Sequence, residues 1–163
     1  MTGIRFEIDD FAFSSYLNEM VRTGQDLTEV MQEAGSYFEG SIKQRFEEGI
    51  SPDGEPWIIS WRAQYEGGKT LVDSAHLQNS FTSLAKSDEV LTGTNVIYAA
   101  IHNFGGVIEA KNAPKLAFKT PTGMAFLDAV TMPKRQFIGF NDNDQAAIED
   151  IFMDYFEEVA NGH

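Results

Sequence analysis

Apolar residues recur every three or four positions in three stretches of the chain, and this spacing predicts three amphipathic helices. The first runs from about Asp10 to Arg22, and the second runs from Gln25 to about Gly49 over about six turns. The apolar stripe of the second helix consists of Leu27, Val30, Met31, Ala34, Phe38, Ile42 and Phe46. The third helix begins at a capping Asp142 or Asp144, and its stripe consists of Ile148, Ile151, Phe152, Tyr155, Phe156 and Val159.

Shorter runs of strand-like pattern lie between the second and third helices. Residues 81–86 and 89–93 predict two strands joined by a tight turn. Residues 116–119 and 124–129 predict a hairpin around a Pro-Thr-Gly turn. We expect the stripe of the second helix to be buried against a sheet that contains residues 90–93 and the first strand of the hairpin.

The remaining segments predict turns, short helices and irregular backbone. Residues 51–54 read Ser-Pro-Asp-Gly, which is turn chemistry. Short helices are predicted at residues 74–81 and 97–104, the second ended by two glycines. Residues 55–69 and 132–140 predict irregular backbone. This order predicts an α+β fold, in which long N-terminal helices pack on a small, mostly antiparallel sheet and an amphipathic helix follows at the C-terminus.

The composition fits a folded domain. Of the 163 residues, 42% are hydrophobic and 13 are phenylalanine, which excludes a disordered chain. There is no cysteine, so neither a disulfide nor a thiolate site is expected. The first residues lack the pattern of a signal peptide, and no apolar run is long enough to span a membrane. We expect a soluble protein that is made in the cytoplasm and has no membrane partner.

Charge is distributed unevenly along the chain. The net charge is -13, and an acidic surface repels nucleic acid, so no direct nucleic-acid binding is expected. Residues 141–163 contain seven acids and no Lys or Arg, whereas residues 110–135 contain five bases and one acid. Either these are two solvated faces, or the opposite charges meet across a subunit boundary.

Candidate chemistry in the sequence is sparse. His76, His102 and His163 are the histidines, and none has the spacing of a metal-binding pair such as H-E-x-x-H. Neither a G-x-S-x-G nucleophile turn nor a phosphate-binding loop is present. We interpret His102 as a structural group, hydrogen-bonded within its helix and turn, and Trp57 and Trp61 as core or interface anchors. No catalytic residue, metal site or cofactor is predicted; the alternative is a small hydrolase that uses His102 or His76 with a carboxylate.

Four segments carry a recognisable pattern. Residues 46–57 read FEEGISPDGEPW, residues 71–81 read LVDSAHLQNSF, residues 92–106 read TGTNVIYAAIHNFGG and residues 133–139 read PKRQFIG. In this order they resemble the phage virion morphogenesis, or tail-completion, proteins of tailed bacteriophages. The segment Y-A-x-I-H-x-F-G-G is the most specific match, while Ala75 stands where the family often has glycine.

The resemblance covers about residues 25–159, so residues 25–163 are expected to form the tail-completion-like domain and residues 1–24 an N-terminal strand and helix extension. It implies a structural subunit of the virion without enzyme activity. Such a subunit would complete or join the tail at the neck as a ring of identical copies, with six-fold symmetry expected from tails of this kind. The expected partners are further copies and neck, connector or tail-tube proteins. Tail completion, tail termination and head closure stay open as alternatives.

The residues that match the family's motifs are Pro52, Asp53, Gly54, Trp57, Gly93, Thr94, Asn95, Tyr98, Ala99, Ile101, His102, Phe104, Gly105, Gly106, Pro133, Arg135, Phe137 and Gly139. We expect most of them to maintain the fold and a minority to form contact surface. Tyr98, Ile101 and Phe104 are spaced as a core stripe, and Phe137 with Ile138 is expected to cover that core. The suspected subunit interface joins Lys111, Lys115 and Lys119 of one copy to Asp150, Asp154 and Glu157 of the next, with apolar contacts from residues such as Phe118 or Phe126.

Overall fold

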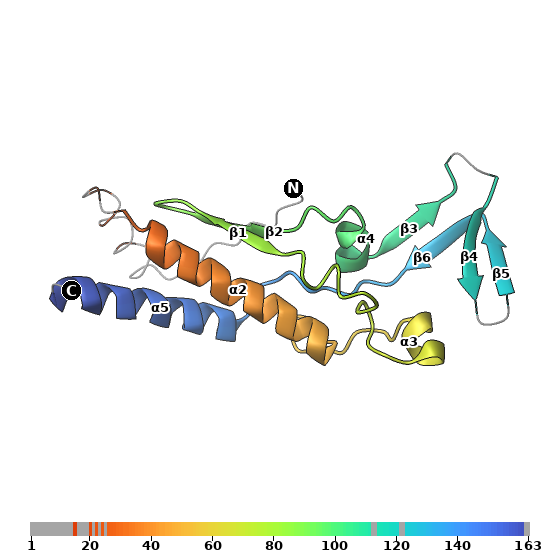
Figure 1. The fold of residues 1–163 in the computed structure, drawn as a ribbon, viewed down its shortest axis with the longest axis horizontal. Helices are drawn as coiled ribbons and strands as arrows, with labels where there is room; N and C mark the ends of the chain where they lie inside the picture. The colour runs from red at the N-terminus through yellow and green to blue at the C-terminus, as the bar shows by residue number, and fades with distance from the viewer. Residues whose placement is uncertain are drawn as a thin grey trace.

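The computed structural model describes residues 15, 20, 22, 24, 26–111, 114–120 and 123–161, apart from the side chain of Lys119. The predicted strand at residues 4–8 and most of the predicted helix at residues 10–22 lie outside this part of the chain. The fold is α+β, as predicted. Two long helices, α2 (Thr28–Glu48) and α5 (Asp142–Asn161), lie side by side in the body of the molecule, and paired strands extend from the other end (Figure 1).

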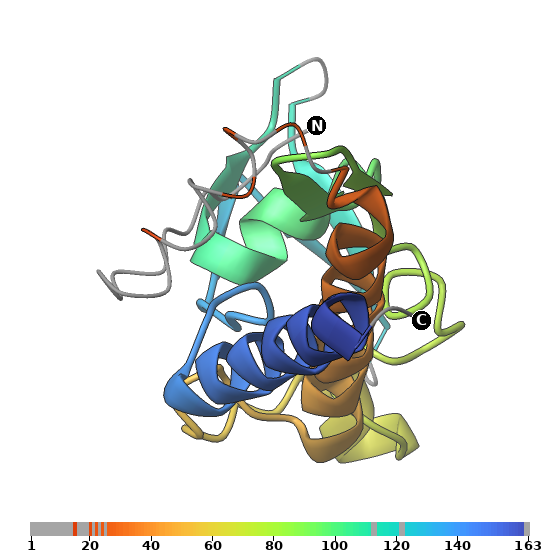
Figure 2. The ribbon, with the colours of Figure 1, turned by 90° about the vertical axis from the view of Figure 1, so that its left-hand side faces the viewer.

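Helices α2 and α5 pack through their apolar stripes, and Figure 2 shows them crossing in the body. Every predicted residue of the α2 stripe is buried, which confirms that prediction. The N-terminal half of the stripe contacts α5 through a cluster that includes Leu27, Val30, Ile148, Phe152 and Phe156. Burial of one such side chain stabilises the fold by about 1.5–3 kcal/mol. The contact therefore joins segments that are about 120 positions apart in the chain (Leu27 to Ile148).

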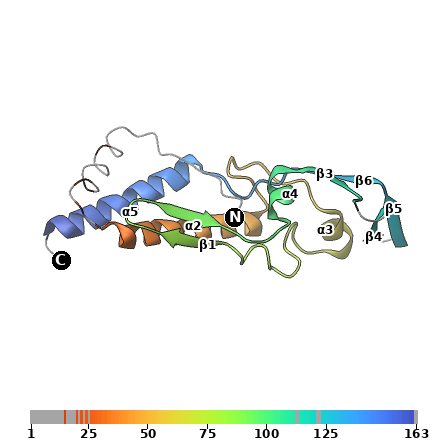
Figure 3. The same cartoon turned by 90° about the horizontal axis from the view of Figure 1, so that it is seen from above.

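Strands β1 (Thr82–Ala85) and β2 (Val90–Gly93) form an antiparallel pair that covers α2, as Figure 3 shows. The helix and the strands approach closely at Gly35, where a Cβ atom would lie 2.7 Å from Cβ of Ser83. The hydroxyl of Ser83 also donates a hydrogen bond to the carbonyl of Gly35. The predicted contact between the second helix and residues 90–93 is confirmed.

The predicted place of the hairpin in that same sheet is wrong. Strands β4 (Leu116–Thr120) and β5 (Gly123–Leu127) do form the predicted hairpin, but it is a separate two-stranded sheet. A third pair, β3 (Gly106–Glu109) with β6 (Ala129–Met132), was not predicted. Alternating polarity identifies a strand but does not identify its partner, because pairing depends on the tertiary arrangement.

Residues 106–132 form an extension that we call the arm, built from the β3–β6 ribbon and the β4–β5 hairpin at its end (Figure 1). None of the described residues of the arm is buried. The arm projects away from the two long helices, so it shares no core with them.

Two short segments differ from the predicted pattern. Helix α3 (Trp61–Glu66) lies in the stretch predicted to be irregular, and the hydroxyl of its N-cap Ser60 accepts a hydrogen bond from Ala63 N–H. Conversely, residues 74–81 form turns instead of the predicted helix, since Ala75 has a left-handed φ of 57°. That backbone conformation interrupts a right-handed helix. The short helix α4 (Ala99–Phe104) is present where predicted.

Aromatic residues form a second core cluster at the C-terminal half of α2. Phe46 is fully buried, and its ring lies 4.9 Å from that of Phe137 and 5.4 Å from that of Trp57, between centroids. Phe81 and Ile138 belong to the same cluster. Trp57, Phe137 and Ile138 are therefore core residues, as the sequence indicated.

Candidate assembly site

The motif segments around the second core are held together by close backbone contacts. Trp57 Nε1 donates a hydrogen bond to the carbonyl of Gln136 at 2.9 Å. A Cβ atom at Gly139 would lie 2.3 Å from Cγ of Pro52, so only glycine fits without movement. These contacts explain why the Pro-Asp-Gly turn and residues 133–139 match the motif together: they pack against each other.

Helix α4 is fixed to the segment after the arm by a side chain that the sequence analysis did not single out. Asn103 is 1% exposed, and its Oδ1 accepts hydrogen bonds from the backbone N–H groups of Phe137 and Ile138, both at 3.0 Å. Gly105 follows with φ of 70°, and a Cβ atom there would lie 2.8 Å from Lys134 N. A polar residue within a short, otherwise apolar helix is the signal in the sequence that could have indicated this role.

The predicted core stripe of α4 is wrong. Tyr98 and Phe104 are 45% and 53% exposed, and Ile101 is half-buried. The buried residues are Ala99 and Asn103, which lie four positions apart on one face of the helix. A six-residue helix buries only a narrow face, so the larger motif side chains are left on the surface. They are available there for contact with another chain.

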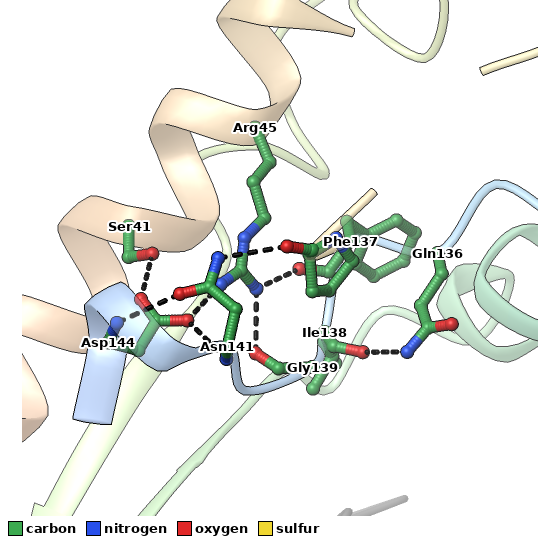
Figure 4. Close-up of polar contacts among 9 residues, drawn as sticks. Ser41, Arg45, Gln136, Phe137, Ile138, Gly139, Asn141 and Asp144 are labelled. Carbon is green, nitrogen blue, oxygen red and sulfur yellow. Dashed lines mark hydrogen bonds and ion pairs between the residues drawn. The ribbon is translucent and has the colours of Figure 1, made fainter. Parts of the chain in front are cut away.

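A buried ion pair joins α2 to the start of α5 (Figure 4). Arg45 pairs with Asp144, and its Nη1 also donates hydrogen bonds to the carbonyls of Phe137 and Gly139, at 3.0 and 2.7 Å. Ser41 donates to the same carboxylate. Burial lowers the pKa of Arg45, and the charge of Asp144 opposes that shift. The sequence analysis missed this pair, which lies between segments 99 positions apart.

The start of α5 also differs from the prediction that Asp142 or Asp144 caps it. The side chain of Asn141 accepts a hydrogen bond from Asp144 N–H, and Asp144 Oδ2 accepts one from Asn141 N–H. This reciprocal pair is a capping box with Asn141 at the cap position. Asp144 is therefore shared between the helix start and Arg45, which a reading of local sequence does not reveal.

His102 is only partly the structural group that we expected. Its backbone carbonyl accepts a hydrogen bond from Arg135 N–H at 2.9 Å, and its ring lies edge-on to Tyr98. However, the ring contributes no hydrogen bond through Nδ1, which is buried and has no partner among the residues that the structure describes. Burial, and then the charge of Arg135, lowers the pKa of His102.

His76 and His102 line one groove of about 520 Å³, together with Trp61, Tyr98 and Arg135. Asp73 also lines the groove, but its carboxylate lies 3.6 Å from Arg62. Within the described ranges, no carboxylate forms a hydrogen bond or ion pair with either histidine, and no group of three side chains is arranged to hold a metal ion. The shared groove is consistent with the hydrolase alternative, but the carboxylate partner that this mechanism requires is not found beside either histidine.

The charged residues of the suspected interface lie far apart within one molecule. Asp150, Asp154 and Glu157 are exposed on α5, while Lys111 and Lys115 belong to the arm. Figures 1 and 3 place α5 and the arm at opposite ends. Lys115 instead lies 3.9 Å from Asp128 of the arm itself. The acidic helix and the lysines of the arm can therefore meet only between molecules.

The match to known proteins agrees with these motif segments. Residues 8–157 match the model of the phage virion morphogenesis family. The chain belongs to this family. It is also similar to the Mu-like prophage FluMu G protein 2 of Haemophilus influenzae, with 30% identity over 145 residues, or 88% of each chain. No solved structure matches the chain.

Family membership assigns this chain to the structure or morphogenesis of a phage virion, as the motifs indicated. The matched region begins at residue 8, so it includes most of the segment 1–24 that the sequence analysis set apart. Among the described residues, no helix is both long and apolar enough to cross a membrane.

Proposed function

We propose that the chain is a structural subunit that completes or joins the phage tail at the neck, as one of several identical copies in a ring. The arm is the observation that carries the proposal. A ring subunit must offer its neighbours a surface that the isolated chain leaves uncovered. The arm is such a surface, and family membership in virion morphogenesis agrees with this role.

The arm has apolar side chains but no core in which to bury them. Its exposed large hydrophobic residues are Val107, Ile108, Met124, Phe126 and Leu127. Two-stranded ribbons of this size are marginally stable in water without further packing, and projecting apolar groups mark interaction sites. A neighbouring subunit that covers the arm would stabilise the ribbons and would also bury these apolar side chains.

The positions of the charges favour a ring over a two-fold dimer. The arm, with its three lysines, and the acidic outer face of α5 are different surfaces at opposite ends of the molecule (Figure 1). Contacts between different surfaces join subunits head to tail, which closes into a ring when the rotation between copies permits it. Exposed pairs contribute only about 0–1 kcal/mol each, so Phe126 and its apolar neighbours would supply most of the affinity. On the basis of the family resemblance, the proposed ring has six copies and contacts neck, connector or tail-tube proteins.

The test is the mass of the purified chain by sedimentation, at low and high salt. The variant changes Lys111, Lys115 and Lys119 to Glu. The matched control changes Lys43, Lys69 and Lys86 to Glu, which alters the net charge equally but lies outside the arm. We expect the wild type and the control to form one larger species at low salt and the arm variant to stay monomeric.

Equal assembly of the arm variant at low salt would refute the role of these charges. If the wild type is monomeric at every concentration, the particle must template the ring. Incorporation of the same three proteins into phage particles then replaces sedimentation as the measurement. A chain that is absent from purified particles would refute the proposed function.

A further inference from the structure

The groove beside α4 contains a buried cation without a counter-charge. Arg135 is 5% exposed, and its Nε donates a hydrogen bond to the carbonyl of Ile58 at 2.7 Å. Across the described part of the chain, neither of its two Nη atoms has a hydrogen-bond partner, and no carboxylate pairs with it. The two Nη atoms are not among the fully buried polar atoms, so they remain accessible from the groove. Burial lowers the pKa of this guanidinium.

A largely buried charge without a counter-ion is less favourable than a paired one, because its partial desolvation is not offset by an opposite charge. Arg45 shows how this chain resolves the same problem elsewhere, with the carboxylate of Asp144 and two backbone carbonyls. Arg135 has one carbonyl only. The chain carries 25 acidic residues, yet none is placed at this guanidinium within the described ranges.

A second polar atom beside the groove also lacks a partner. Nδ1 of His102 is buried and makes no hydrogen bond to the residues that the structure describes. Arg135 is close enough to His102 for its charge to lower the pKa of the imidazole. A carboxylate bound in the groove would accept hydrogen bonds from the Nη atoms of Arg135, a geometry that guanidinium groups suit. The exposed rings of Trp61 and Tyr98 provide apolar walls beside it.

We propose that this groove binds a carboxylate from helix α5 of a second copy of the chain. The proposal rests on the ring described above and names where its contact lies. Asp150, Met153 and Asp154 are exposed at positions i, i+3 and i+4, so they share one face of α5. Met153 is 52% exposed and can contact the aromatic walls while one of the carboxylates reaches Arg135.

Charge and arrangement identify α5 as the source. Residues 141–163 contain seven acids and no Lys or Arg, and all of these acids except Asp144 lie outside the core, which gives this segment an acidic surface. Helix α5 runs away from α3, α4 and the arm (Figure 1), so its outer face meets the groove of another copy in a head-to-tail contact. The groove lies at the base of the arm, and it extends the proposed contact from the arm's lysines to the body.

Cysteine cross-linking tests the contact directly, because the chain contains no cysteine. Ser74 lines the groove and is exposed, so Ser74→Cys places a thiol there with little change in shape. This variant is mixed under mild oxidation with Glu157→Cys, an exposed position on the same face of α5 that leaves Asp150 and Asp154 in place, and mass spectrometry measures the mixed disulfide dimer. Ser36→Cys, on the exposed side of α2, replaces Ser74→Cys in the control mixture.

We expect the mixed dimer with Ser74→Cys and only a background amount with Ser36→Cys. Equal amounts in both mixtures, or no mixed dimer, would overturn the proposal. Sedimentation of the same samples before oxidation separates the two proposals: larger species without the specific cross-link refute the groove contact and leave the ring. If neither the cross-link nor any larger species is found, the result counts against the ring and against the groove contact.

A second measurement asks whether the carboxylates matter. Asp150→Asn with Asp154→Asn should weaken self-association about tenfold or more, since a hydrogen bond to a charged group contributes about 1.5–3 kcal/mol. Glu33→Gln with Glu47→Gln is the matched control, because it removes the same charge from exposed positions of α2. Equal association of the two double variants would overturn the assignment of α5 as the carboxylate source.

Discussion

The body and the arm of this protein are built from similar kinds of residue but in opposite ways. In the body, apolar stripes of α2 and α5 are buried, and the buried ion pair of Arg45 and Asp144 is surrounded by further hydrogen bonds. In the arm, side chains such as Phe126 and Leu127 are exposed, although they are as hydrophobic as those of the body. Apolar content alone therefore does not distinguish a core from a contact surface. The difference is whether a second layer of helices or strands packs against the apolar side chains.

The largest expected effect comes from removing one partner of the buried ion pair. Asp144→Ala leaves Arg45 buried without its carboxylate and removes the capping box of α5. We expect the free energy of unfolding to fall by about 3–5 kcal/mol. Chemical denaturation measures this change, with Asp150→Ala on the exposed face of the same helix as the control. Similar stability of the two variants would show that the ion pair does not support the body.

A phenylalanine in each region makes the comparison direct. Phe38→Ala removes a buried ring of the α2 stripe and should cost about 3–5 kcal/mol, giving insoluble or partly unfolded protein. Phe126→Ala removes an exposed ring of the arm and should change stability by no more than about 0.5 kcal/mol, while weakening assembly. Melting temperature and sedimentation mass are the two measurements. A well-folded Phe38→Ala protein with an unchanged melting temperature contradicts the assignment of this stripe to the core.

Glycine positions sharpen the comparison within the body. Gly139→Ala places a methyl group against Pro52 and should destabilise by about 1–3 kcal/mol. Gly40→Ala, in the exposed middle of α2, meets no atom and should stabilise by about 0.5–1 kcal/mol. Thermal unfolding of both variants checks the opposite signs. Equal shifts of the melting temperature in the same direction would show that the close packing against Pro52 does not prevent a larger residue at position 139.

The smallest expected effect is the pH dependence from His102. Its pKa in the folded chain is below the ordinary value of 6.5, so the unfolded chain binds the proton more readily. The stabilising contribution of the neutral side chain is present above about pH 6.5 and decreases as pH falls below that value. His102→Gln should flatten this slope between about pH 5 and 7, and His76→Gln is the control at an exposed position. An unchanged slope in His102→Gln would contradict the burial of the imidazole.

The sequence by itself determined the elements whose pattern is local and repeated. The α2 stripe, the β1–β2 and β4–β5 hairpins and the C-terminal helix follow from periodicity, since the same faces that the pattern marks as apolar contact the core or the partner strand. The Y-A-x-I-H-x-F-G-G segment also identified the family that the whole-chain match shows. These signals are available because each depends on residues within about one element.

Only the tertiary structure decided which distant residues meet. The pairing of β3 with β6, the ion pair between Arg45 and Asp144, and the hydrogen bonds from Phe137 and Ile138 to Asn103 all join residues that are at least 20 positions apart. The exposure of Tyr98 and Phe104 likewise depends on which face of α4 the body covers. Hydrophobic spacing specifies that a face is to be buried, but the partner that buries it is set by the packing of the whole chain. For the arm and the groove at Arg135, we infer that this partner is a second molecule.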